Sequence, residues 1–117
     1  MSHIASHADG KVLVIQYTQS RILDETTIGT VANEVNALID KTQDPNVVLD
    51  FSKVAFMSSS MLGQLVKLHK KCKQYKINLA LCGITKDIME VFKMTRLHKR
   101  FNIQPTIDKA RDSLLKL

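Results

Sequence analysis

The sequence predicts an α/β layer fold, and three observations carry that prediction. Short apolar and β-branched runs, residues 11–17, 47–49 and 77–82, are typical of strands. Between them lie two longer segments, 24–41 and 59–75, whose apolar residues recur every three to four positions, as on one face of a helix. Strands that alternate with helices favour parallel pairing through right-handed crossovers. We therefore expect a single-domain α/β fold with a mixed β-sheet of four to five strands and about four helices.

Length and composition indicate one globular domain. At 117 residues, 44% of them hydrophobic, the chain can build one core, and with few aromatic residues and no Trp that core should be aliphatic. We place the domain at residues 1–117, with 1–10 as an N-terminal strand or tail. Cys72 and Cys82 form no C-x-x-C motif and are expected to be reduced thiols. No signal peptide and no membrane-spanning stretch is recognisable, so we expect a cytoplasmic protein without membrane contact.

The first third of the chain predicts a hairpin followed by a helix. Residues 4–7 can form a strand that turns at Asp9-Gly10 and pairs antiparallel with 11–17. Residues 18–23 are interpreted as a polar connector. The helix over 24–41 has N-cap candidates in Asp24, Thr26 and Thr27, and Pro45 ends any helical continuation.

The last third predicts a helix, a short strand and a final helix. Gly83 ends the strand 77–82, and Thr85 is the expected cap of the next helix. A short strand over 101–103 follows, and Thr106 is expected to cap a helix that runs to the end of the chain. The expected inward positions of these two helices are Ile88, Val91, Phe92 and Leu97, then Ile107, Ala110, Leu114 and Leu117.

Charge does not by itself indicate nucleic-acid binding. The formal net charge is +6 and the isoelectric point is about 9.5, and five lysines cluster on and just beyond the second helix. These lysines are Lys67, Lys70, Lys71, Lys73 and Lys76. Apart from Tyr75 no aromatic residue is interleaved with them, and no zinc-finger, homeodomain or RNA-recognition motif is present. We interpret the cluster as a solvated face or a face that meets an acidic protein, with no direct nucleic-acid contact.

The residue pattern also argues against an enzyme. The four histidines show no metal-ligand spacing. Around Ser59, Met57 and Met61 occupy the glycine positions of a G-x-S-x-G nucleophile elbow, and no glycine-rich phosphate loop is present. We therefore predict no catalytic residue, no metal and no cofactor.

The most informative stretch joins the strand 47–49 to the second helix. It places Ser58, Ser59 and Ser60 where that helix begins. The first N–H groups of a helix have no internal partners, and the helix dipole puts partial positive charge there. A serine oxygen from Ser58 or Ser59 can therefore cap the helix, and a phosphate would be well tolerated.

This stretch resembles the signature of STAS domains in the anti-sigma factor antagonist family. The resemblance rests on Asp50-Phe51-Ser52 and on the run from Val54 to Gly63, VAFMSSSMLG. Gly83, Thr95-Arg96-Leu97 and Phe101 also resemble the family, so the likeness extends from about Val12 to Leu117. Two positions depart from the usual pattern, since Ser58 replaces an Asp and Met61 replaces a Gly.

The resemblance implies partner switching. The unphosphorylated domain would bind an anti-sigma factor that is also a serine kinase, phosphorylation of Ser59 would release it, and a phosphatase would reset the switch. The expected partner-binding residues are Asp24, Met57, Ser58, Ser60, Met61 and Gln64. Asp24 is expected near the serine loop, as a helix cap or as a group that positions a kinase or a metal. Met61 is expected to cover the first helical turn as an apolar anchor.

Two other interpretations stay open at this stage. The domain can serve as an unphosphorylated scaffold or interaction subunit of a signalling assembly, which predicts self-association, such as a homodimer, and no dependence on Ser59. It can also be a small-ligand or nucleotide-binding module, as some STAS-like domains are, although no glycine-rich cradle favours this.

Overall fold

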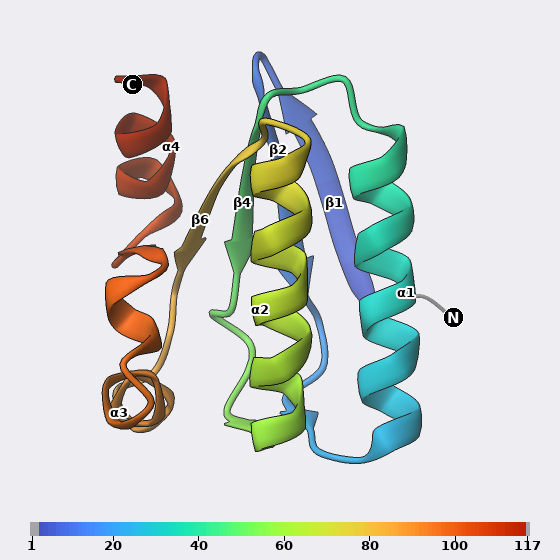
Figure 1. Cartoon of the computed structure of the whole chain (residues 1–117), viewed down its shortest axis with the longest axis vertical. Coiled ribbons are helices and arrows are strands. Elements are labelled where there is room, and N and C mark those ends of the chain that lie inside the picture. The colour runs from blue at the N-terminus through green and yellow to red at the C-terminus, as the bar shows by residue number, and fades with distance from the viewer. Residues whose placement is uncertain (1–2, 117) are drawn as a thin grey trace.

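The computed structural model describes residues 3–116, which form a sheet covered by helices on both faces (Figure 1). The elements follow one another as β1 (Ile4–Asp9), β2 (Val12–Tyr17), β3 (Arg21–Ile22), α1 (Glu25–Lys41), β4 (Asn46–Asp50), β5 (Phe56–Met57), α2 (Ser59–Gln74), β6 (Asn78–Cys82), α3 (Lys86–Met94), a 3-10 turn η1 (Leu97–Lys99), β7 (Asn102–Gln104) and α4 (Ile107–Leu115).

The main sheet has five strands in the order β1-β2-β4-β6-β7. The hairpin strand β1 runs antiparallel to β2, with Ile4 opposite Tyr17, and the other neighbours are parallel. Gly10 closes the hairpin with a φ of +66°, a left-handed conformation that glycine adopts without strain. The predicted mixed sheet and its four helices are confirmed.

Alternate residues of the buried strands point to two cores. Leu13, Ile15 and Leu49 face α1, α2 and α3 and belong to the larger core. Val12, Val14 and Val48 point the other way, toward α4. Figure 1 shows α1 and α2 side by side in front of the sheet. A strand covered on both faces must be apolar at successive positions, which explains the Val47-Val48-Leu49 run.

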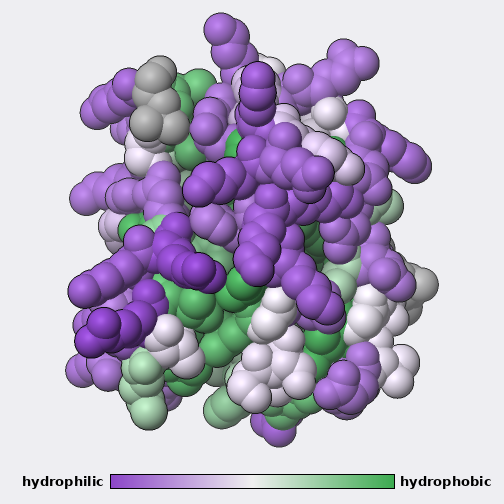
Figure 2. Space-filling view, in the orientation of Figure 1, coloured by the Kyte–Doolittle hydropathy of each residue, from purple (hydrophilic) through white to green (hydrophobic). Residues whose placement is uncertain are grey.

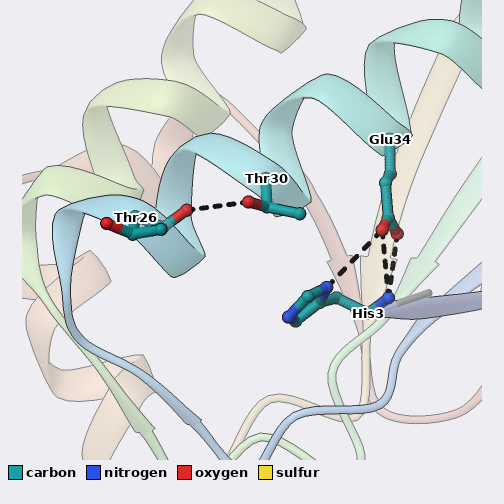
Figure 3. A network of polar contacts seen from close by, with 4 residues as sticks. All are labelled: His3, Thr26, Thr30 and Glu34. Atoms are coloured by element: carbon teal, nitrogen blue, oxygen red, sulfur yellow. Dashed lines mark hydrogen bonds and ion pairs between the residues drawn. The ribbon is translucent and has the colours of Figure 1, made fainter. Parts of the chain in front are cut away.

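Polar contacts fasten the outer strand to α1. The backbone N–H of His3 donates to both carboxylate oxygens of Glu34, at 2.9 and 3.2 Å, and the His3 ring nitrogen Nδ1 lies 3.5 Å from Oε1 (Figure 3). On the same helix the Thr30 hydroxyl donates to the Thr26 carbonyl at 2.9 Å. The His3–Glu34 contacts join the residue before β1 to α1 across 31 residues of sequence, whereas the Thr30–Thr26 bond lies within α1.

Three predicted helix caps are confirmed. The side chains of Asp24, Thr85 and Thr106 accept hydrogen bonds from backbone N–H groups in the first turns of α1, α3 and α4. No helix among residues 3–116 is long and apolar enough to cross a membrane.

The structure also corrects the sequence-based interpretation at several positions. Arg21–Ile22, within the expected polar connector, forms a strand that pairs with β5 in a second, two-stranded sheet. Ile22 is fully buried, and two apolar residues, Ile22 and Leu23, at the end of a polar segment are too weak a pattern to predict this. Val91 was expected to point inward but is 38% exposed, because α3 buries only Ile88 and Phe92. Leu117 lies outside the described residues.

Gly83 allows two strand ends to approach closely. A Cβ at this position would lie 2.8 Å from Asp50 Oδ1 and 2.8 Å from the backbone nitrogen of Ser52, and the backbone φ is +70°. Asp50 is buried and accepts hydrogen bonds from the Ser52 N–H at 2.9 Å and the Gln16 side chain at 3.0 Å. The glycine thus permits the turn by which the chain leaves β4 toward the serine loop.

Replacing Gly83 with Ala should therefore destabilise the protein by more than ~2 kcal/mol, since a left-handed non-glycine residue alone costs about 1–3 kcal/mol and the Cβ would also clash. Gly29→Ala is the matched control, because nothing lies within 4 Å of a Cβ there and a helical alanine stabilises by about 0.5–1 kcal/mol. Urea unfolding measures the change in unfolding free energy for both variants. Equal unfolding free energies for the two variants would contradict the close approach.

Candidate functional site

The three serines are positioned by the two-residue strands β3 and β5. Arg21 pairs with Phe56 and Ile22 with Met57 in parallel register. The N–H of Ser58 then donates to the Ile22 carbonyl at 3.1 Å. Because α1 begins three residues after Ile22, this pairing brings the start of α1 next to the start of α2.

Each serine has a different environment. Ser59 and Ser60 are exposed, whereas Ser58 is half-buried. The Ser60 hydroxyl donates to Glu25 Oε1 at 3.3 Å, which joins α2 to the first turn of α1. The Ser58 hydroxyl oxygen is buried and has no hydrogen-bond partner within residues 3–116. Ser59 is the first residue of α2, and its side chain is open to solvent.

No serine side chain caps α2. Ser58 stands at the N-cap position, with φ −82° and ψ 164°, but its side chain makes no capping hydrogen bond. The expectation that Ser58 or Ser59 caps this helix is therefore wrong. The first turn of α2 also contains no acidic residue, so neither a side-chain cap nor a carboxylate of α2 itself offsets the positive end of its dipole.

One carboxylate from α1, that of Glu25, reaches the first turn of α2. Asp24 caps α1 by accepting from the Thr27 N–H at 3.0 Å, and hydrogen bonds from Thr27 hold the pKa of Asp24 below its usual range. Glu25 follows and reaches Ser60. Within residues 3–116 no group of three or more His, Cys, Asp or Glu is arranged to hold a metal. A kinase-positioning or metal-positioning role for Asp24 stays a prediction.

An apolar rim surrounds the serine loop. Leu23 is 41% exposed and Phe56 is 53% exposed, while Met57 is half-buried. The Arg21 guanidinium lies 4.9 Å from the centroid of the Phe56 ring. Figure 2 shows hydrophilic residues over the C-terminal half of α2 and white and green residues toward the end where α2 begins. Leu23 and Phe56 were not among the predicted binding residues, although Leu23 immediately precedes Asp24 and Phe56 lies three residues before Ser59. Their exposure is seen only in the structure.

The structure corrects the predicted role of Met61 as a surface binding residue. It was expected to anchor a partner from the surface, but it is 1% exposed and belongs to the larger core. Counting from the start of α2 at Ser59, Met61 lies on the same helix face as Leu65 and Leu68, which are also buried. Gln64 is half-buried and lines a small cavity together with Met61, Leu65 and Leu68.

The two thiols are buried and take no part in this surface. Cys72 and Cys82 are free, and burial raises their pKa values to about 11 and about 12. A thiol rather than a thiolate is therefore present near neutral pH, which makes both residues poor nucleophiles.

Comparison with known proteins identifies the family. The family model of the STAS domain matches residues 4–110. The chain belongs to the STAS domain family. The resemblance read from the serine loop is thus confirmed, whereas the assignment of all of residues 1–117 to one domain stays a prediction.

Three proteins that this STAS domain resembles are named as anti-sigma factor antagonists. The chain is 27% identical over 95 residues to an anti-sigma F factor antagonist of Paenibacillus polymyxa, covering 81% of this chain and 79% of that protein. It is also similar to the solved anti-sigma-factor antagonist (STAS) domain protein of Planctomyces limnophilus, with 26% identity, a TM-score of 0.78 and 92% and 93% of the two chains covered. An antagonist from Mycobacterium paratuberculosis has a TM-score of 0.83 at 22% identity over 94% and 91%, which shows the same fold.

The burial of Met61 generates a stability prediction. Met61→Ala should lower the free energy of unfolding by about 2–5 kcal/mol, the usual cost of a cavity left by a buried methionine. Lys67→Ala, an exposed position on the same helix, should change it by no more than about 0.5 kcal/mol. Thermal or urea unfolding measures the free energy of unfolding of both variants. If the Met61→Ala protein were as stable as the Lys67→Ala protein, the burial of Met61 would be contradicted and its predicted role as a surface anchor would be supported.

Proposed function

We propose that this STAS domain is an anti-sigma factor antagonist that acts by partner switching, with Ser59 as the switch. Unphosphorylated, the serine loop binds an anti-sigma factor that is also a serine kinase. Phosphorylation of Ser59 releases the partner and a phosphatase restores binding. The observation that carries the proposal is the exposure of Ser59 as the first residue of α2, within an apolar rim.

The proposed binding surface combines apolar and polar groups. Leu23, Phe56 and Met57 offer the apolar area that the centre of a protein interface requires. Asp24, Ser60 and Gln64 would contribute polar contacts around it, and Ser58, whose hydroxyl oxygen is buried, would contribute through its other atoms. Met61 would contribute indirectly, because its buried side chain packs the first turn of α2 against the core.

Phosphate on Ser59 would disfavour such a contact. It adds a charge of about −1.5 to −2, which a partner would have to desolvate or match with a cation. The apolar rim offers no compensating charge other than Arg21, and Glu25 already places a carboxylate beside Ser60. A penalty of only ~3 kcal/mol weakens binding roughly a hundredfold.

The same phosphate would be compatible with the fold. Ser59 points to solvent and belongs to neither core. The uncapped first turn of α2 supplies N–H donors and a favourable dipole for an anion. One modification would thus change an interface and leave the domain folded.

An alternative function is a constitutive interaction subunit that does not depend on Ser59. The observation that favours it is the outer strand β1, in which every residue from Ala5 to Asp9 is exposed and which contains neither Lys nor Pro. Edge strands without such guards can pair with another chain, including a second copy in a homodimer.

Ser59 variants separate the two functions. We expect Ser59→Asp to weaken capture of the partner from the protein's own cells by roughly ten- to a hundredfold, or ~1.4–2.8 kcal/mol, and Ser59→Ala to retain it. Gln43→Glu adds the same charge at an exposed turn before β4 and should bind like the wild type.

Mass spectrometry of the tryptic peptide Val54 to Lys67 identifies the modified serine. Phosphate on Ser59 supports the switch. Wild-type affinity in both Ser59 variants, with an unmodified peptide under all growth and stress conditions, would instead favour the constitutive subunit.

A further inference from the structure

A strongly cationic pocket lies on the other half of α2. It is a cavity of about 340 Å³ lined by His69, Lys70 and Lys73 of α2 and by Arg100, which follows η1. A volume in this range suits a small molecule. Ten residues of helix separate His69 from Ser59, or roughly 15 Å along the axis. The pocket is therefore distinct from the serine loop.

The chain supplies no acid from the two segments that form this pocket. Residues 51–86 and residues 91–107 contain no Asp or Glu. The ion pairs within residues 3–116 are His3–Glu34, Lys71–Asp40 and Arg111–Asp9, so none of the four lining residues takes part in one. Lys71 turns away from the pocket, since its Nζ lies 2.6 Å from Asp40 on α1. The positive charge of the pocket is thus left uncompensated.

Packing positions the His69 ring and the turn that carries Arg100. The His69 ring packs edge to face against Phe101, with centroids 5.0 Å apart, and Phe101 packs in the same way against the buried Phe92. Arg96 takes a left-handed conformation with φ +62°, which starts η1, and the Arg100 N–H donates to the Leu97 carbonyl at 2.9 Å. The turn that carries Arg100 is therefore defined by backbone contacts as well as by the aromatic core.

We propose that this pocket binds a compact, multiply charged anion of the phosphate class, such as the diphosphate group of a soluble metabolite. The Arg100 guanidinium offers a planar set of donors suited to phosphate oxygens, and Lys70 and Lys73 add point charges. His69 supplies a further nitrogen donor when protonated.

The protonation of His69 agrees with this electrostatic picture. Burial lowers its pKa, and the charges of Lys73 and Arg100 lower it further. The groups that line the pocket with it are Lys70 and Lys73 on its own helix and Arg100 across the pocket, all of them cationic. A bound anion would offset this repulsion, so it should raise the pKa of His69.

Inorganic pyrophosphate is the probe, and the ring protons of His69 in NMR spectra are the readout. We expect saturable binding that raises the His69 pKa, while His7, exposed on the outer strand β1, serves as the internal reference whose ring signals do not respond to pyrophosphate. The Lys70→Gln/Lys73→Gln double variant should bind at least tenfold more weakly. Lys67→Gln/Lys76→Gln removes the same number of charges from exposed positions and should stay within twofold of the wild type.

The outcomes separate this site from general electrostatics and from the serine switch. Equal weakening in the two double variants, or equal shifts of His69 and His7, would overturn the proposal in favour of diffuse attraction. Absence of saturable pyrophosphate binding would overturn it as well, and would leave the basic surface to an acidic protein. Ser59→Ala should bind pyrophosphate like the wild type, so the failure of either proposal is visible without the other.

Discussion

The pairing of β3 with β5 determines the geometry of the candidate site. Two residues on each side, together with the Ser58 N–H to Ile22 carbonyl bond of 3.1 Å, join the start of α1 to the start of α2. Without this contact Glu25 would have no reason to meet Ser60, and Leu23 and Phe56 would not flank the same serines. A very short sheet thus brings together residues that are more than thirty positions apart in the chain.

Helix α2 has two chemically different ends. Its first turn has no acidic residue, no side-chain cap and an apolar surround. Its last turns carry an uncompensated cationic pocket around His69. An anion is favoured at the first end by the helix dipole and at the second by side-chain charge. Because both ends belong to one rigid helix, we propose that the domain offers two separate surfaces, one switched by phosphorylation and one occupied by a small anion.

The sequence predicted elements better than the surface that they form. Apolar periodicity and turn residues identified the main strands, the helices and the caps at Asp24, Thr85 and Thr106, because these depend on neighbours in the sequence. The resemblance to STAS domains identified the serine loop as the candidate site. The burial of Met61 was misjudged because the helix had to be placed against a core before its inner face was known. Leu23 and Phe56 lie beside predicted site residues in the sequence, but their exposure could not be predicted, since it depends on how β3 and β5 pair and pack.

We propose that a phosphate on Ser59 changes a binding surface without changing the fold. Protein with phosphoserine incorporated at position 59 can be compared with the unmodified chain by amide NMR spectra and thermal unfolding. We predict shift changes confined to Leu23–Glu25 and Met57–Gln64, with an unchanged unfolding midpoint. Shift changes that spread through β2, β4 and β6, or a lower midpoint, would contradict the account, because the phosphate would then act by remodelling the core.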